Sequence, residues 1–274
     1  MTKINKIVAA YFSATGTTKK AVEEMAAAAA GKLGLPCEIR SFTLPEGRKE
    51  PLVFAADELV FLGTPVYAGR VPNVLLKYLK TMVGNGALGV PVAVYGNRNY
   101  DDALVELRDL METAGLHTIA GAAFIGEHSF STILGAGRPD QEDLAEAKGF
   151  GENVAAKVQS GKLNEGPVAV KGNVPYRPYY VPKMQDGSNK NIIKVFPKVD
   201  KDKCNNCQIC VQLCPLGSIN SEDVATYSGI CIKCGACVKG CPQGARYYDD
   251  PVYEYHKTNL EENFMRRAKP EMFL

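Results

Sequence analysis

The sequence predicts two folded units, an α/β domain with a doubly wound parallel sheet of five strands and a small α+β domain rich in cysteine. Two observations support this prediction. Before about residue 171, short apolar runs alternate with longer segments of helical periodicity, which is typical of a parallel sheet covered by helices on both faces. After residue 199, eight of the nine cysteines fall between Cys204 and Cys241.

The expected strands and helices alternate along the first 160 residues. Apolar runs predict strands at 4–12, 37–42, 58–63, 90–95 and 118–125. Helical periodicity predicts helices at 17–33, 73–82, 101–114 and 141–160. Five strands in one such unit suit the flavodoxin strand order 2-1-3-4-5, in which a ligand binds beyond the carboxyl ends of the strands.

Composition divides the chain into four parts: the α/β domain at 1–171, a linker at 172–199, the cysteine domain at 200–250 and a C-terminal tail at 251–274. Prolines at 175, 178, 182 and 197 exclude a continuous helix in the linker. The linker holds five Lys or Arg and one Asp, and we expect it to be pinned to the surface. A docking surface for an acidic partner is the weaker alternative. The tail is either a helix bracing the two domains or a dimer contact.

Two cysteine runs with identical spacing predict the chemistry of the second domain. Each run reads Cys-x2-Cys-x2-Cys-x3-Cys-Pro, and the second repeats the first 27 residues later. In the bacterial ferredoxin spacing, the first three thiolates of a run bind one cluster and the fourth ligates the other cluster. We therefore assign one 4Fe-4S cluster to Cys204, Cys207, Cys210 and Cys241, and a second to Cys231, Cys234, Cys237 and Cys214.

Three other interpretations of the cysteines fit less well. A disulfide framework needs an oxidising compartment, and we expect no export of this chain. Zinc sites usually take two CxxC pairs with a longer spacer. Chance does not account for a duplicated match at eight positions. Cys37 lies outside both runs, and we expect it to be a buried small residue rather than a ligand.

The loop after the first expected strand reads SATGTTKK and opens a helix. Its hydroxyl groups and the N–H groups of the helix N-terminus can bind a phosphate group, and Gly16 lets the backbone approach closely. The loop matches neither the GxxxxGK[ST] pattern nor GxGxxG. Taken alone, it is equally well explained as a helix capped by Ser or Thr.

Two further loops follow the third and fourth expected strands, and they should converge with the first loop at one edge of the sheet. They read GTPVYAGRVP at 63–72 and YGNRNYDDAL at 95–104. Tyr67 and Tyr100 can sandwich a flat ring, with a stacking energy of about 0.5–1.5 kcal/mol each. Backbone N–H groups near Gly96 and Asn97 can bond the edge of that ring. The three loops together favour a ligand site over simple helix capping.

The motifs SATGTT, TPVYAGR and GNRNYDDA resemble the FMN-binding loops of flavodoxins, over roughly residues 4–160. Tyr100 matches a position where many flavodoxins stack a tyrosine, and Tyr67 stands where the other loop often has tryptophan. Arg70 and Arg98 make the site less acidic than in a typical flavodoxin, which would favour the anionic reduced flavin and raise its potential. The resemblance implies that the FMN phosphate is bound by Ser13, Ala14, Thr15, Gly16, Thr17 and Thr18, and the isoalloxazine by Pro65, Val66, Tyr67, Ala68, Gly69, Gly96, Asn97, Arg98, Asn99, Tyr100 and Asp101.

The whole chain resembles a family of anaerobic proteins that joins an N-terminal flavodoxin domain to a C-terminal ferredoxin domain with two 4Fe-4S clusters. The segments IGEHSFS (125–131) and YRPYYVP (176–182) share this resemblance, and His128 is a candidate group near the flavin. The resemblance implies an electron-transfer protein that relays electrons between FMN and the clusters and onward to redox partner proteins. The alternatives are an FMN-dependent reductase of a small acceptor such as a quinone, and a redox-sensing binding module.

The composition is that of an ordinary globular protein, with 46% hydrophobic and 23% charged residues and a formal net charge of +2. This charge gives no case for a nucleic-acid or membrane partner. The apolar segment near the N-terminus is too short for a membrane span and lacks a signal-peptide cleavage pattern. We therefore expect a cytoplasmic protein in a reducing, anaerobic interior.

Overall fold

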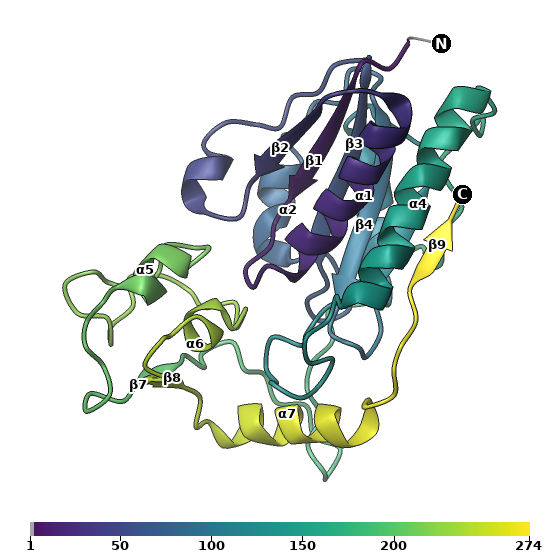
Figure 1. The fold of residues 1–274 in the computed structure, drawn as a ribbon. Helices are drawn as coiled ribbons and strands as arrows, with labels where there is room; N and C mark the ends of the chain where they lie inside the picture. The colour runs from purple at the N-terminus through teal and green to yellow at the C-terminus, as the bar shows by residue number, and fades with distance from the viewer. Residues whose placement is uncertain (1–2) are drawn as a thin grey trace.

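A computed structural model describes residues 3–274, and one parallel sheet forms its centre (Figure 1). The strands pair in the order β2-β1-β3-β4-β6, which is the predicted order 2-1-3-4-5 of the five principal strands. The expected strand at 118–125 is divided in two, and both parts pair with β4. The strands are β1 (Lys6–Tyr11), β2 (Cys37–Ser41), β3 (Glu58–Pro65), β4 (Leu88–Tyr95), β5 (His117–Thr118) and β6 (Gly121–Ile125).

Helices cover both faces of this sheet, as the uniformly apolar central strands predict. One face packs against α1 (Thr17–Leu33) and α4 (Gln141–Ser160), and the other against α2 (Asn73–Leu79) and α3 (Ala103–Thr113). A single 3-10 turn, η1 (Pro45–Arg48), follows β2. The two apolar layers are fully buried, and each large side chain in them contributes roughly 1.5–3 kcal/mol. This core fixes the strand ends and therefore the loops that follow them.

The cysteine-rich segment folds beside the carboxyl ends of the strands (Figure 1). Its regular elements are short: β7 (Lys198–Val199), α5 (Ile209–Leu213), α6 (Ala236–Lys239) and β8 (Arg246–Tyr247). Strands β7 and β8 pair in antiparallel fashion, and α5 packs against α6. Its apolar core consists of few side chains and includes four of the cysteines. A domain with so small a core needs bound cofactors or neighbouring structure for stability.

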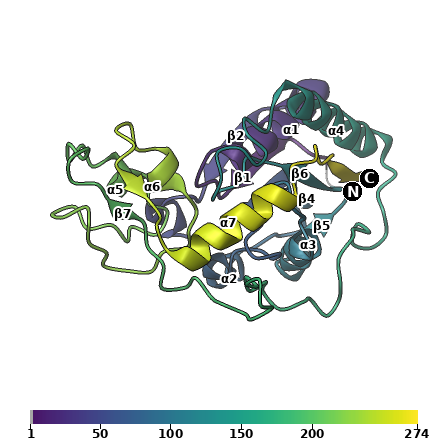
Figure 2. The same cartoon turned by 90° about the horizontal axis from the view of Figure 1, so that it is seen from below.

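The C-terminal tail spans both domains. Its helix α7 (Pro251–Asn263) follows the cysteine domain and crosses beneath the carboxyl ends of the sheet strands (Figure 2). Its last residues form β9 (Glu271–Phe273), which pairs antiparallel with β6 at the edge of the sheet. The tail is therefore a brace between the domains, the first of the two alternatives. The sequence analysis did not predict β9.

The linker is pinned to the α/β domain by its aromatic and basic residues. Arg177 forms an ion pair with the buried carboxylate of Asp102 at 2.7 Å. This hydrogen bond is the main reason that the pKa of Asp102 is lowered far below its ordinary value. The guanidinium of Arg70 lies over the rings of Tyr176 and Tyr179, 4.6 and 5.0 Å from their centroids. These contacts hold the linker alongside the loop after β3.

Within residues 3–274, no helix is both long and apolar enough to cross a lipid bilayer.

Candidate flavin cleft and cysteine sites

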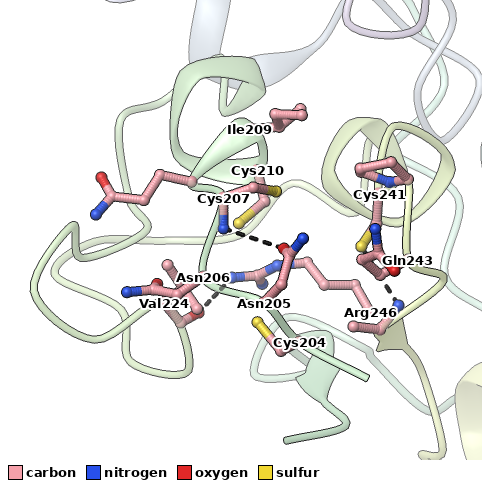
Figure 3. Close-up of a pocket in the computed structure, with 13 residues that line it drawn as sticks. Cys204, Asn205, Asn206, Cys207, Ile209, Cys210, Val224, Cys241, Gln243 and Arg246 are labelled. Carbon is pink, nitrogen blue, oxygen red and sulfur yellow. Dashed lines mark hydrogen bonds between the residues drawn. The ribbon is translucent and has the colours of Figure 1, made fainter. Parts of the chain in front are cut away.

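The first set of cysteines surrounds one cavity, shown in Figure 3. The structure brings the fourth cysteine of the second run next to the three cysteines of the first run, in the crossed arrangement that the spacing predicts. Cys207 is exposed, and the other three are half-buried. This first set consists of Cys204, Cys207, Cys210 and Cys241.

The second set is more enclosed. The thiols of Cys231, Cys237 and Cys214 are close enough to Cys234 for their charges to act on it. Cys234 and Cys237 are only 8% and 9% exposed, and burial raises the pKa of each thiol to about 12. A bound cluster would offset this cost, because iron binds the thiolate form. The second set consists of Cys214, Cys231, Cys234 and Cys237.

The two cysteine loops share an unusual backbone. Asn206 and Gln208 in the first loop have positive φ angles of 54° and 59°. Lys233 and Gly235, 27 residues later, have φ angles of 53° and 76°. Left-handed residues at these matched positions give the two loops the same local curvature. The sequence repeat is therefore also a conformational repeat.

Backbone N–H groups point at the sulfur atoms in both sets. The N–H of Ser218 donates to Cys214 Sγ at 3.3 Å, and the N–H of Ala245 donates to Cys241 Sγ at 3.3 Å. Such donors favour thiolates and tune the potential of a bound cluster. In the described chain, residues 3–274, no group of three or more His, Cys, Asp or Glu side chains is placed to hold a single metal ion. Each set supplies four thiols, which is the donor set of a 4Fe-4S cluster.

The loop after β1 has free donors at the start of α1. Gly16 caps the helix with a φ of 85°, and the space beside its Cα is open. Ser13 is already engaged, because its Oγ accepts from the N–H of Lys19 at 3.0 Å. Among residues 3–274, the buried Oγ1 atoms of Thr18 and Thr64 have no hydrogen-bond partner. Open space and the unpaired hydroxyl of Thr18 at the start of α1 fit a phosphate group. Thr64 lies on β3, on the face of the sheet opposite α1. The rest of the predicted segment, Ala14, Thr15 and Thr17, is half-buried at the same loop.

The loops after β3 and β4 line a cleft of about 430 Å³ together with the cysteine domain. Tyr67 and Arg70 exchange backbone hydrogen bonds of 3.0 and 3.1 Å across a tight turn, with positive φ at Ala68 and Gly69. A side chain at Gly69 would meet the carboxylate of Asp101, at 2.8 Å from its Cβ. The α/β loops contribute Val66, Tyr67, Ala68, Gly69, Gly96, Arg98 and Asn99 to this cleft, and the cysteine domain contributes Ile230, Cys231, Ile232 and Lys233.

Four predicted ring-binding residues do not line the cleft: Pro65, Asn97, Tyr100 and Asp101. Tyr100 packs in the core against Tyr95, with ring centroids 5.6 Å apart, so it is not placed to stack on a flavin. The Nδ2 of Asn97 donates to the carbonyl oxygens of Phe264 and Arg266 at 2.6 and 2.7 Å. The C-terminal tail therefore occupies the side-chain amide of Asn97, whereas the prediction for the flavin edge concerned the backbone N–H groups near Gly96 and Asn97. The prediction that Tyr67 and Tyr100 sandwich a flat ring is therefore wrong for Tyr100.

Two histidines face the cleft in their neutral form. Burial lowers the pKa of His128 to about 3, with further contributions from His256, Lys239 and Arg98. Burial and Arg98 lower the pKa of His256 to about 4. The Nδ1 of His128 accepts from the N–H of Phe130 at 3.1 Å, which leaves Nε2 as the protonated nitrogen. A Cβ at Gly96 would lie 2.4 Å from the His128 ring, so the histidine packs directly on this glycine.

The docking contact between the domains was missed by sequence reasoning. Lys239 donates to the carboxylate of Glu127 and to the carbonyl oxygens of His128 and Ser131, the last two at 2.7 Å. A Cβ at Gly235 would lie 2.4 Å from the carbonyl oxygen of Ser129, so the two backbones are in close contact. Helix α6 and the residue before it therefore pack against the segment 125–131. Its resemblance to the fusion family was the only signal in the sequence.

Tyr67 joins the two sites. Burial and the neighbouring thiols of Cys234 and Cys231 raise its pKa well above the ordinary value. A second aromatic contact runs through Tyr248, whose hydroxyl lies 4.0 Å from Cys231 Sγ and whose ring stacks on Tyr253 at 3.9 Å. The second cysteine set therefore lies against the predicted flavin loop.

The prediction that Cys37 is buried is wrong. It lies on β2 at the edge of the sheet, and its residue is exposed. Side chains of β2 are alternately exposed and half-buried, and Cys37 is one of the exposed ones. Cys37 remains outside both cysteine sets.

A protein-family match was found for the second domain. Residues 203–246 match the 4Fe-4S dicluster domain family. No match was found among curated proteins. The similar solved structures include a flavodoxin from the domain Archaea, with 19% identity, 56% of this chain and 99% of that chain covered, and a TM-score of 0.41.

Two further solved structures show the same degree of likeness. A flavodoxin from Streptococcus pneumonia TIGR4 has 19% identity over 56% of this chain and 99% of its own, with a TM-score of 0.38. A flavone reductase has 10% identity over 62% of this chain and 67% of its own, with a TM-score of 0.41. We draw no functional conclusion from these likenesses. The strand order and the dicluster match together show a flavodoxin-like fold joined to a 4Fe-4S ferredoxin-like domain.

Proposed function

We propose that this protein relays electrons between FMN and two 4Fe-4S clusters within one chain, and onward to redox partner proteins. One observation carries the proposal: Cys231 of the second set lines the same cleft as Tyr67 and Gly96 of the flavin loops. The two cofactor sites thus share a wall. A shared wall keeps donor and acceptor close without a diffusional encounter.

The cofactors would supply the redox chemistry. When bound, FMN would supply two-electron chemistry and each cluster one-electron chemistry. The nine cysteines are all free thiols, which suits a reducing compartment such as the cytoplasm. Electrons would enter from a partner protein at one end and leave to another.

The residues of the chain position the cofactors and set the local charge. The start of α1 would hold the phosphate, with the unpaired hydroxyl of Thr18 in its first turn. Neutral His128 presents Nε2–H as a hydrogen-bond donor near the ring. Arg98 is paired with Asp101 and lies 5.3 Å from the centroid of Tyr180, so its charge is partly compensated.

The arrangement predicts an order of transfer. The second set adjoins the flavin loops, whereas the first set opens to solvent at Cys207. The order from the flavin is therefore the cluster of the second set, then the cluster of the first set, then the partner. Helix α7 and the linker cover the remaining sides of the cleft, as Tyr180 and His256 show by stacking at 5.7 Å.

Anaerobic purification followed by flavin, iron and sulfide analysis tests the proposal. We expect one FMN and about eight irons and eight sulfides per chain. Rapid mixing with a chemical reductant should then show flavin and cluster bleaching that are kinetically coupled within one molecule, independent of protein concentration. Protein that contains zinc, or that binds no flavin, would contradict the proposal.

A second candidate is an FMN-dependent reductase of a small acceptor such as a quinone. The observation in its favour is the volume of the cleft, about 430 Å³, with His128 and His256 among its lining residues. Steady-state turnover with quinones separates the two functions. A carrier reduces protein partners at useful rates and small acceptors slowly, whereas a reductase shows saturable turnover of the small acceptor.

A further inference from the structure

Arg246 is a buried cation at the first cysteine set. Its residue is only 4% exposed, and it lines the same cavity as that set. Its Nη1 donates to the hydroxyl of Tyr227 at 2.9 Å, and its Nη2 donates to the carbonyl oxygen of Val224. Among residues 3–274, its buried Nε has no hydrogen-bond partner. A buried N–H without a partner is unfavourable, which points to an acceptor that binds there.

The cavity offers sulfur acceptors to this group. Figure 3 shows the Arg246 side chain extending from the side of Cys241 toward the cysteines of the first run. The guanidinium is near the thiols of Cys237 and Cys210, and the backbone N–H and charge of Arg246 act on Cys241. Two of these three thiols belong to the first set. The charge of Arg246 also acts on Cys237 of the second set, but the cavity that Arg246 lines contains all four cysteines of the first set and none of the second.

We propose that Arg246 donates its Nε–H to the sulfur of the 4Fe-4S cluster held by the first set and raises the reduction potential of that cluster. The inference rests on the proposed clusters. Reduction adds one negative charge to a cluster, and a buried cation with an N–H directed at sulfur stabilises the reduced form. Screening by salt is weak at a buried site, so the effect persists at physiological ionic strength.

The repeat explains why the effect is unequal between the clusters. The residue that corresponds to Arg246, 27 positions earlier, is Ile219, an apolar residue only 5% exposed. The domain has another buried cation, Lys233, but it donates to the carbonyl oxygens of Ile193 and Cys231 at 2.7 and 2.8 Å. Lys233 lines the flavin cleft rather than the first cavity. The two cations therefore lie at different sites, Lys233 at the flavin cleft and Arg246 at the first set. A higher potential of the first-set cluster would favour electron transfer from the second set to the first.

Redox titration of the full chain, followed by electron paramagnetic resonance, tests this assignment. The variants Arg246→Met and Lys233→Met each remove one buried cation from the same domain. We expect Arg246→Met to lower the reduction potential of one cluster by about 59 mV, a tenfold change in its one-electron equilibrium. Lys233→Met should leave that same cluster unchanged. The variant Cys207→Ser identifies the cluster, because it alters only the signal of the first set.

Arg246→Met that shifts both clusters equally, or neither, overturns the proposal. If this variant does not retain iron, Arg246→Lys is titrated instead, because it keeps the charge but loses Nε. A lower potential of the first-set cluster in Arg246→Lys supports the proposal, and an unchanged potential overturns it. A wild-type chain without 4Fe-4S signals would instead overturn the proposed function, so the two failures are distinguishable.

Discussion

The two cysteine sets have the same ligand spacing but different surroundings. In the first set, Cys207 is exposed and the cavity is lined only by residues of the cysteine domain. In the second set, Cys234 and Cys237 are buried, and Tyr67 of the flavin loop lies beside them. The local repeat thus sets which atoms bind a cluster. Contact with the α/β domain sets the solvent exposure of each cluster site and its distance from the flavin loops.

One pair of matched positions shows how docking acts on the sequence. Gln208 and Gly235 occupy the same place in the two loops and share a left-handed backbone. At the first loop a side chain fits, and the amide of Gln208 donates to the carbonyl oxygen of Ser221 at 3.1 Å. At the second loop the backbone of Ser129 leaves no room for a side chain. The glycine is therefore required by the domain contact as well as by its φ angle.

Replacing the fourth cysteine of each run with alanine tests the comparison between the two cysteine sets, and we expect this change to have the largest effect. Cys214→Ala and Cys241→Ala should each lose one cluster, so that iron falls from about eight to about four per chain. Cys214→Ala removes the cluster next to the flavin and should abolish rapid transfer from flavin to iron. Cys241→Ala removes the distal cluster and should preserve that transfer. Iron analysis and rapid mixing measure both, and the reverse pattern would refute the crossed ligand assignment.

Loss of the contact between α6 and segment 125–131 should leave the second set exposed to solvent and apart from the flavin loops, as the first set is. Lys239→Met removes three hydrogen bonds from a charged donor, which stabilise the docked state by about 2–3 kcal/mol. We expect transfer between flavin and clusters to slow at least about tenfold and to become dependent on solvent viscosity, because the domains must then redock.

The matched control for this variant is Lys203→Met, whose ammonium group pairs only with Asp200 of its own domain and is mostly exposed. Absorption spectra should show intact flavin and clusters in both variants. Transfer rates in Lys239→Met equal to those of the control would show that docking does not limit electron transfer.

Acid should also destabilise the folded protein through His256. The folded pKa of His256, about 4, lies below the ordinary value of 6.5. Above pH 6.5 the ring is neutral in both states and contributes no pH dependence. As the pH falls from 6.5 to 4, only the unfolded chain takes up the proton, so stability declines by up to about 3 kcal/mol. In His256→Gln, the melting temperature should fall less between pH 6.5 and pH 4 than in the wild-type protein. An equal fall in the two proteins would show that other groups cause it.

The sequence predicted the fold well because its signals are local. Continuous apolar runs and a helical period specify the strands of the α/β domain, and α1 and α4 begin and end where that period predicts. The strand β9 was not predicted, because three residues at a chain end carry too little pattern. Tyr100 was assigned to the flavin from the position of its loop alone. Side-chain direction decided otherwise, because the ring turns into the core beside Tyr95.

The sequence alone determined the two sets of four cysteines, since ligand spacing is a property of the chain. It also determined the three loops at the carboxyl edge of the sheet, since strand order follows from the alternation of elements. Only the tertiary structure decided that Lys239 docks on segment 125–131 and that Cys231 faces the flavin cleft. It alone left the Nε of Arg246 unpaired beside the first set. These features join residues more than a hundred positions apart, or depend on the direction of one buried side chain, and neither leaves a periodic signal in the sequence.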